Sequence, residues 1–231
     1  MSLITLENVT KVYQTGEVPV TALKDINLEI DRRAFVSFIG PSGSGKSTLL
    51  NLIGALDKPT QGSIAISGTH LGTLSRRDAA NFRGEMLGFI FQNFNLIPVL
   101  TVYENVEYPL LMIQRVPAKE RRERIYDLLH KVGMFDQKGK YPSQISGGQK
   151  QRAAIARALV TNAQIVLADE PTANLDHDTA FKVISIMHEM QKQYGTTFIF
   201  STHDSKIVGE AEILYTLEDG RLTNHEIRNQ R

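Results

Sequence analysis

The chain of 231 residues contains no cysteine, and it has no long hydrophobic run. The absence of cysteine excludes disulfide bonds and thiolate metal sites, and it is compatible with a reducing compartment. No apolar stretch approaches the roughly 18 to 20 residues that a membrane-spanning helix needs. Residues 1–7 also lack the basic and apolar regions of a signal peptide. If the protein works at a membrane, we expect a separate chain to supply the spanning part.

An excess of charge of either sign is also missing. The 26 lysines and arginines nearly balance the 25 acidic residues, which leaves a formal net charge of +1. The total charge therefore gives no electrostatic reason to expect a nucleic-acid partner. Hydrophobic residues make up 42% and charged residues 22%, both ordinary for a globular protein. The length suits one large domain or two closely packed lobes.

Short apolar runs and helical patterns alternate along most of the chain. We expect strands at 3–9, 26–30, 35–39, 62–67, 87–91, 165–168, 197–201 and 213–217. Helices are expected at 46–56, 101–113, 117–132, 149–160 and 179–194. Gly16 and Pro19 indicate a loop between the first two strands, and Asp219-Gly220 is typical of a hairpin turn. Alternation of this kind favours an α/β fold with a mainly parallel sheet.

The middle of the chain differs from the rest, because helical patterns dominate there and strand patterns do not alternate with them. We interpret residues 93–160 as an approximate, inserted helical subdomain within a single domain of residues 1–231. The segment from Phe94 to Met112 carries many apolar and aromatic residues, including Tyr103, Tyr108 and Leu110. These residues either form the core of the helical lobe or line a groove for a short helix of a membrane partner.

A glycine-rich loop follows the expected strand at 35–39 and opens the next helix. Gly40, Gly45, Lys46 and Ser47 satisfy the P-loop pattern G-x-x-x-x-G-K-[ST]. Glycines let backbone N–H groups turn inward around phosphate oxygens, and the helix directs its positive end at the same anion. Lys46 adds a charge at the β- and γ-phosphates, and the Ser47 hydroxyl is placed to bind Mg²⁺. The predicted phosphate-binding residues are Gly40, Pro41, Ser42, Gly43, Ser44, Gly45, Lys46, Ser47 and Thr48.

An apolar strand at 165–168 ends in two carboxylates, Asp169 and Glu170. In P-loop nucleotide hydrolases an aspartate at such a strand end holds Mg²⁺, directly or through water. Glu170, one residue further, is placed to act on the attacking water as a general base. The alternative is a strand end capped by solvated acids.

A second glycine loop, Ser146-Gly147-Gly148-Gln149, precedes the helical pattern at 150–160. It offers another helix start suited to an anion, with Ser146 as the N-cap. One nucleotide needs only one P-loop. The second loop therefore suggests a two-fold dimer in which each chain covers the other chain's ATP, although an ordinary N-cap with a flexible Gly-Gly explains the same residues.

The combination of motifs resembles the ATP-binding cassette (ABC) ATPases. Five segments carry the resemblance, in the order of the family and over almost the whole chain: the Q-loop at 91–93, the signature motif at 145–152, the acidic strand end at 169–172, the D-loop at 174–176 and the switch-histidine segment at 201–204. The resemblance implies a P-loop fold with a mainly parallel core sheet, an N-terminal antiparallel β subdomain and an inserted helical subdomain. It also implies ATP and Mg²⁺ as cofactors.

Several roles follow from the resemblance alone. Tyr13 would stack on the adenine, and Gln92 would sense Mg²⁺ and the attacking water. His203 would contact the γ-phosphate and hold Glu170 or the water in line, and Asp176 would lie at the dimer interface. In the family the signature loop acts in trans, which agrees with the inference drawn from the second glycine loop.

Within the family, the chain is most similar to the ATPases of lipoprotein-releasing (LolD-type) and macrolide-exporting (MacB-type) systems. This resemblance implies a homodimer on ATP binding, a separate integral-membrane permease as partner and a place at the cytoplasmic face of the inner membrane. Ile145, Ala173 and the segment 32–34 depart from the usual pattern without touching a phosphate-contacting position.

Three other functions fit parts of the sequence. An envelope complex that transmits a mechanical signal, as in FtsE-type systems, would use the same ATPase without transport. An ABC ATPase of translation or DNA repair would usually carry two fused cassettes or long coiled-coil insertions, which are absent here. A small-molecule kinase would share only the P-loop, and the signature and switch-histidine segments disfavour it. The sequence names no transported substrate.

Overall fold

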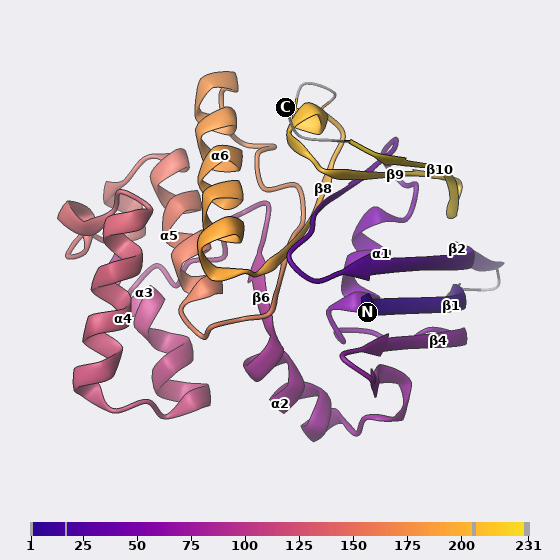
Figure 1. Cartoon of the computed structure of the whole chain (residues 1–231), viewed down its shortest axis with the longest axis horizontal. Coiled ribbons are helices and arrows are strands. Elements are labelled where there is room, and N and C mark those ends of the chain that lie inside the picture. Colours follow the sequence, from indigo (N-terminus) through magenta and orange to yellow (C-terminus); the bar gives the residue numbers. More distant parts are fainter. Residues whose placement is uncertain (1, 17, 205–206, 229–231) are drawn as a thin grey trace.

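The computed structural model describes residues 2–16, 18–204 and 207–228. Its N-terminal part is a four-stranded antiparallel sheet in the order β2-β1-β4-β5 (Figure 1). The strands are β1 (Ser2–Thr15), β2 (Val18–Asp31), β4 (Gln61–Ile66) and β5 (Thr69–His70). β1 and β2 are much longer than the sequence suggested, since both reach almost to Gly16 and Pro19 lies within β2.

The second sheet has six strands in the order β10-β9-β3-β8-β7-β6. They are β3 (Phe35–Ile39), β6 (Leu87–Ile90), β7 (Ile165–Ala168), β8 (Thr197–Thr202), β9 (Ile213–Glu218) and β10 (Arg221–Ile227). All neighbouring pairs are parallel except β9 and β10. The carboxyl ends of β3, β6, β7 and β8 therefore meet at one edge, where open α/β sheets bind ligands.

Two apolar cores lie on the two faces of this sheet, because side chains alternate along each strand. Phe198 and Phe200 of β8 pack with the helices α3 (Val102–Pro109), α4 (Ala118–Lys131), α5 (Gly147–Leu159) and α6 (His177–Tyr194). Ile199, between them, packs with α1 (Lys46–Ile53) and the antiparallel sheet. In Figure 1 the helices α3 to α6 lie on the left and the antiparallel strands on the right. The α/β architecture with a mainly parallel sheet and an antiparallel N-terminal sheet is thus confirmed.

Two of the expected helices end several residues before the predicted limit. α1 ends at Ile53 rather than residue 56, because Ala55 adopts a left-handed φ of 51°. The helix expected at 101–113 ends as α3 at Pro109 and continues as a π-helical turn, η2 (Leu110–Gln114). Proline lacks the N–H that an α-helix would use there, which explains the change.

The helix α2 (Arg76–Met86) was not expected at all. It fully buries only Gly84, and its apolar side is short, with Phe82 and Met86 partly buried against the core, so the periodic signal is weak. Its start does carry a local signal, since the Ser75 hydroxyl accepts a hydrogen bond from the Asp78 amide at 3.2 Å. A serine three residues before an acidic residue is a common helix start. Among all helices of the described residues, none is long and apolar enough to cross a membrane.

Gly88 allows β6 to approach α5 closely, and this contact generates a prediction. A Cβ at Gly88 would lie 2.2 Å from the Ala158 carbonyl oxygen. We expect Gly88→Ala to lower the free energy of unfolding by about 1–3 kcal/mol, since neither backbone can move away cheaply. Urea unfolding measures this loss. The matched control is Gly72→Ala, where nothing lies within 4 Å of the added carbon; equal stability of the two variants would contradict the close approach.

Candidate functional site

The P-loop connects the end of β3 with the start of α1. Gly40 and Gly45 have φ angles of 151° and 105°. A Cβ at Gly40 would lie 2.0 Å from the Leu217 carbonyl oxygen, and one at Gly45 would lie 2.6 Å from the Ala22 carbonyl oxygen. Backbone atoms of β9 and β2 therefore lie in direct contact with the loop, and only glycine fits at both positions.

The loop is supported from behind by the turn between β9 and β10. Gly220 donates its N–H to the Ser44 carbonyl at 3.1 Å and accepts a hydrogen bond from the Lys24 amide at 2.7 Å. Asp219 and Gly220 have φ angles of 46° and 75°, so the turn predicted from these two residues is confirmed. The turn thus connects the loop to β2 through backbone hydrogen bonds alone.

Lys46 lies inside the loop and is only 5% exposed. Its ammonium donates to the carbonyl oxygens of Gly40 and Pro41, both at 2.8 Å. The Ser44 hydroxyl is buried nearby without a hydrogen-bond partner within the described part of the chain. Pro41, Ser42 and Gly43 form the exposed outer part of the loop. A glycine cradle with an enclosed cation suits a polyphosphate.

Asp169 joins the P-loop to the ends of two strands. It follows β7, and its carboxylate Oδ1 accepts hydrogen bonds from the Ser47 hydroxyl at 3.1 Å and from the Ser201 hydroxyl at 2.7 Å. Ser201 also accepts a hydrogen bond from the Glu170 amide at 2.9 Å. Ser201 was not among the predicted site residues. Its position depends on β8 lying beside β7, which the sequence does not state.

Glu170 and His203 lie next to each other beyond the same strand ends. The Glu170 Oε1 atom is 3.1 Å from the His203 Nδ1 atom. The carboxylate is mostly covered, with 25% of its side chain exposed, whereas 61% of the histidine is exposed. Glu170 has a left-handed φ of 45°, which is strained for a side chain that is neither glycine nor asparagine. An acid held in such a conformation beside a phosphate loop is suited to proton transfer.

Gln92 follows β6, the strand next to β7, and its side chain is exposed. The backbone of the Q-loop is held from two sides. Asn174 donates its amide to the Gln92 carbonyl at 3.0 Å, and Arg157 of α5 donates to the Phe94 carbonyl at 2.8 Å and to the Asn95 carbonyl. Burial lowers the pKa of the Arg157 guanidinium. Neither Asn174 nor Arg157 was predicted as a site residue, because carbonyl anchoring leaves no recognisable spacing in a sequence.

Tyr13 lies on β1, at the side of α1, with 36% of its surface exposed. Its hydroxyl donates to the Asp57 carboxylate at 2.9 Å. Partial burial and this hydrogen bond raise the pKa of Tyr13 above its usual value. The phenol therefore stays neutral and can hold its ring in one orientation.

The signature loop packs against the D-loop. Ser146 is the N-cap of α5 and forms a reciprocal pair of hydrogen bonds with Gln149, at 3.3 and 2.9 Å. A Cβ on Gly147 would lie 3.3 Å from the Leu175 side chain, and one on Gly148 would lie 2.3 Å from the Thr179 side chain. These contacts place the loop against residues that follow β7 rather than against the P-loop of the same chain.

Asp176 caps the next helix in the same way. Its carboxylate accepts a hydrogen bond from the Thr179 amide at 3.0 Å at the start of α6. Hydrogen bonds from the Thr179 hydroxyl and amide hold the pKa of Asp176 below its usual range. Two capped helix starts, those of α5 and α6, thus lie side by side.

The site suits ATP together with Mg²⁺. The Ser47 and Asp169 oxygens lie within 3.1 Å of each other, at the mouth of the phosphate cradle. Within the described ranges, no group of three or more His, Cys, Asp or Glu residues forms a ready metal cage.

Comparisons with known proteins agree with this site. The model of the ABC transporter family matches residues 23–173. The lipoprotein-releasing system ATP-binding protein LolD of Pseudoalteromonas translucida is 42% identical, over 97% of this chain and 96% of LolD. The macrolide export ATP-binding/permease protein MacB of Bartonella henselae is 43% identical, over 96% of this chain and 33% of MacB.

A solved structure is similar over almost the whole chain. It is the dimeric, post-hydrolysis state of the ATP-binding cassette MJ0796 bound to ADP and Pi, and it shares 42% identity with a TM-score of 0.89. The match covers 98% of this chain and 100% of the other. MJ0796 is an uncharacterised ABC transporter ATP-binding protein of Methanocaldococcus jannaschii. The chain therefore belongs to the ABC transporter family, as an ATP-binding cassette ATPase that is similar to LolD and MacB.

Proposed function

We propose that the chain works as one of two copies that close around ATP and thereby drive a separate membrane permease. The observation that carries this proposal is the chain of hydrogen bonds from Ser47 through Asp169 and Ser201 to Glu170, with His203 beside it. It joins the phosphate loop to the ends of β7 and β8. A change at the γ-phosphate would therefore be transmitted to the P-loop and to the ends of β7 and β8 together.

Phosphate binding is assigned to the residues 40–48. The backbone of the loop and the Lys46 ammonium bind the phosphate oxygens, and Thr48 extends the positive start of α1. Ser47 and Asp169 would hold Mg²⁺, together with Gln92, which follows β6. Mg²⁺ supplies neutralisation of the charge that develops on the phosphates.

Glu170 is the proposed general base. Its Oε1 atom accepts the proton of the attacking water, and His203 keeps the carboxylate in line through the contact at 3.1 Å. The Ser201 hydroxyl fixes the backbone of Glu170 and so sets where the carboxylate points. Gln92 aligns the same water from the neighbouring strand.

The composite site of two copies is proposed for the signature loop. Ser146, Gly147, Gly148 and Gln149 would cover the phosphates of the partner's nucleotide, and Asp176 would lie at the interface between the copies. Within its own chain the loop packs against Leu175 and Thr179. The dimeric structure of the similar cassette supports this arrangement.

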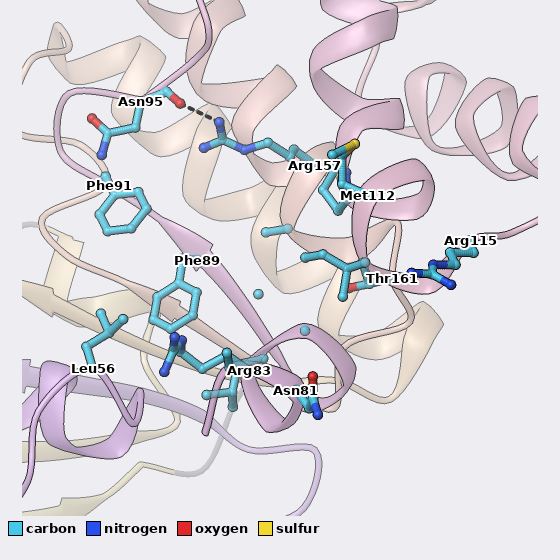
Figure 2. A pocket seen from close by; sticks show the side chains of 17 residues that line it. Leu56, Asn81, Arg83, Phe89, Phe91, Asn95, Met112, Arg115, Arg157 and Thr161 are labelled. Atoms are coloured by element: carbon cyan, nitrogen blue, oxygen red, sulfur yellow. Dashed lines mark hydrogen bonds between the residues drawn. The ribbon is translucent and has the colours of Figure 1, made fainter. Parts of the chain in front are cut away.

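A groove between the two lobes is the proposed docking site of the permease. Its volume is about 740 Å³, and Figure 2 shows Phe89, Phe91 and Met112 around it, with Arg157 pointing to Asn95. Leu111, Met112 and Ile113 leave about half of their surface exposed at residues 111–113. A short apolar helix would cover these side chains, which supports the helical lobe at 93–160 as the part that transmits motion. The protein would then lie peripherally at the cytoplasmic face of the inner membrane.

Glu170→Gln tests the general base. The variant keeps the shape of the side chain but cannot take the proton, so we expect it to bind ATP, to lose turnover and to accumulate as a dimer. Steady-state phosphate release and size-exclusion chromatography with ATP measure both effects. Glu189→Gln, on the exposed side of α6, is the matched control. Near-normal turnover of Glu170→Gln would refute the assignment.

Ser201→Ala tests the junction at Asp169. A hydrogen bond to a charged group contributes about 1.5–3 kcal/mol, so we expect turnover to fall roughly tenfold to a hundredfold while the protein stays folded. The control is Ser37→Ala, since the Ser37 hydroxyl is buried in β3 with no hydrogen-bond partner among the described residues. If the two variants hydrolyse ATP equally fast, Ser201 does not position Glu170.

Ser146→Arg tests the site shared between copies. A bulky cation at the start of α5 would block the partner's nucleotide, so we expect hydrolysis to be lost while a single chain still binds ATP. Ser75→Arg is a matched control, because Ser75 caps α2 in the same manner far from the signature loop. ATP titrations of dilute protein measure binding to the single chain. If Ser146→Arg abolished this binding, the proposal that the signature loop covers the partner's nucleotide would be contradicted.

A further inference from the structure

A buried lysine lies beneath the ring of Tyr13. Lys11 and Tyr13 are two residues apart on β1, which places both side chains on one face of the sheet. Lys11 is 9% exposed, and its ammonium nitrogen is 4.7 Å from the centroid of the tyrosine ring. An ammonium over an aromatic face is attracted by the ring quadrupole. One face of the ring is therefore occupied, and a planar group can stack only on the other.

Asp57 binds both residues at once. Its Oδ1 atom accepts a hydrogen bond from the Lys11 ammonium at 2.8 Å, and its Oδ2 atom accepts one from the Tyr13 hydroxyl at 2.9 Å. The ammonium also donates to the Lys58 carbonyl at 2.8 Å. Burial opposes ionisation of Asp57, but the hydrogen bonds from Lys11 and the Lys58 amide hold the pKa of its carboxyl below the usual range. The three side chains thus form one hydrogen-bonded unit, in which Tyr13 is neutral.

The unit is attached to the helix that carries the P-loop lysine. α1 begins at Lys46 and ends at Ile53, and the Asp57 amide donates back to the Asn51 carbonyl of this helix at 3.3 Å. A helix of eight residues is about 12 Å long. The segment after the end of α1 therefore supports the ring of Tyr13 through Asp57, and Thr48 at the start of the helix also contacts the Tyr13 side chain.

We propose that Lys11 and Asp57 are positioning residues for nucleotide binding, which hold the ring of Tyr13 as a rigid platform for the base. The inference rests on the proposed stacking of Tyr13 on adenine and adds two residues that act through it. Two charged groups contact the tyrosine side chain: the Lys11 ammonium lies over the face of the ring, and the Asp57 carboxylate accepts a hydrogen bond from the hydroxyl. Both must be in place for the open face to keep its orientation toward the base, because a partly exposed tyrosine otherwise loses rotamer freedom on binding.

A ligand without a base separates this role from a structural one. Inorganic tripolyphosphate suits the P-loop but has no planar group to stack on Tyr13. Titrations of the full chain with ATP and with tripolyphosphate, both in EDTA to prevent hydrolysis, therefore report the two ends of the site independently. We expect Lys11→Met and Asp57→Asn to weaken ATP binding about tenfold, which corresponds to about 1.4 kcal/mol, and to leave tripolyphosphate binding unchanged. In the presence of Mg²⁺, KM should rise while kcat at saturating ATP stays close to that of the unaltered chain.

Three further variants complete the test. Tyr13→Ala should weaken ATP binding at least as strongly, and Lys11→Met in the Tyr13→Ala background should add nothing further. Lys58→Met is the matched control, since its ammonium binds the carbonyls of Gly72 and Leu74 instead of the platform. It should leave both titrations unchanged.

The outcomes distinguish the platform from its support. Equal weakening of ATP and tripolyphosphate in Lys11→Met and Asp57→Asn would overturn the proposal, because the pair would then merely stabilise α1. Weakening in Tyr13→Ala without any in the two positioning variants would overturn the proposal but leave base stacking intact. Unchanged ATP binding in Tyr13→Ala would overturn both.

Discussion

The carboxylate of Asp169 accepts hydrogen bonds from two hydroxyls that belong to distant parts of the chain, Ser47 at the start of α1 and Ser201 at the end of β8. A carboxylate with these two partners cannot move without moving either the phosphate loop or the strand that leads to His203. The parallel order β3-β8-β7-β6 makes the junction possible, because it brings these strand ends to one edge of the sheet. The rest of the site is arranged around this point.

The surrounding loops are held through their own backbones, by neighbouring backbone in one case and by side-chain donors in the other. The P-loop is pressed by the carbonyls of Ala22 and Leu217, and the Q-loop is held by Asn174 and Arg157 through its own carbonyls. Arg157 also lines the apolar groove between the lobes. A partner that fills this groove would therefore contact Arg157, which is hydrogen-bonded to the Q-loop. This gives a physical connection between the proposed docking site and the nucleotide edge of the sheet.

The sequence predicted some elements well and others poorly, for identifiable reasons. The strands β3 and β7 are short, apolar except for Ser37 and flanked by polar motifs, so their limits were found closely. α2 was missed because it lies on the surface with one buried residue, and the break after α3 depends on how Pro109 is accommodated. β1 and β2 were predicted too short, since much of their outer halves is exposed and does not alternate cleanly between apolar and polar residues, although the two strands pair there.

The same division applies to the site. The glycines of the P-loop, the two acids after β7 and the serine that caps α5 were evident in the sequence, because each has a chemical role that allows few residue types at a fixed spacing. Ser201, Asn174, Lys11 and Asp57 were not evident as a group. The residues of each contact are far apart along the chain. The separation is 32 residues for Ser201–Asp169 and 82 for Asn174–Gln92. It is 46 for Lys11–Asp57 and 44 for Tyr13–Asp57. The sequence by itself determined the chemistry and the family. Only the tertiary structure decided which side chains hold the reactive side chains in place. The reason is that the order of strands in the sheet, and not the order of residues along the chain, determines which residues are neighbours.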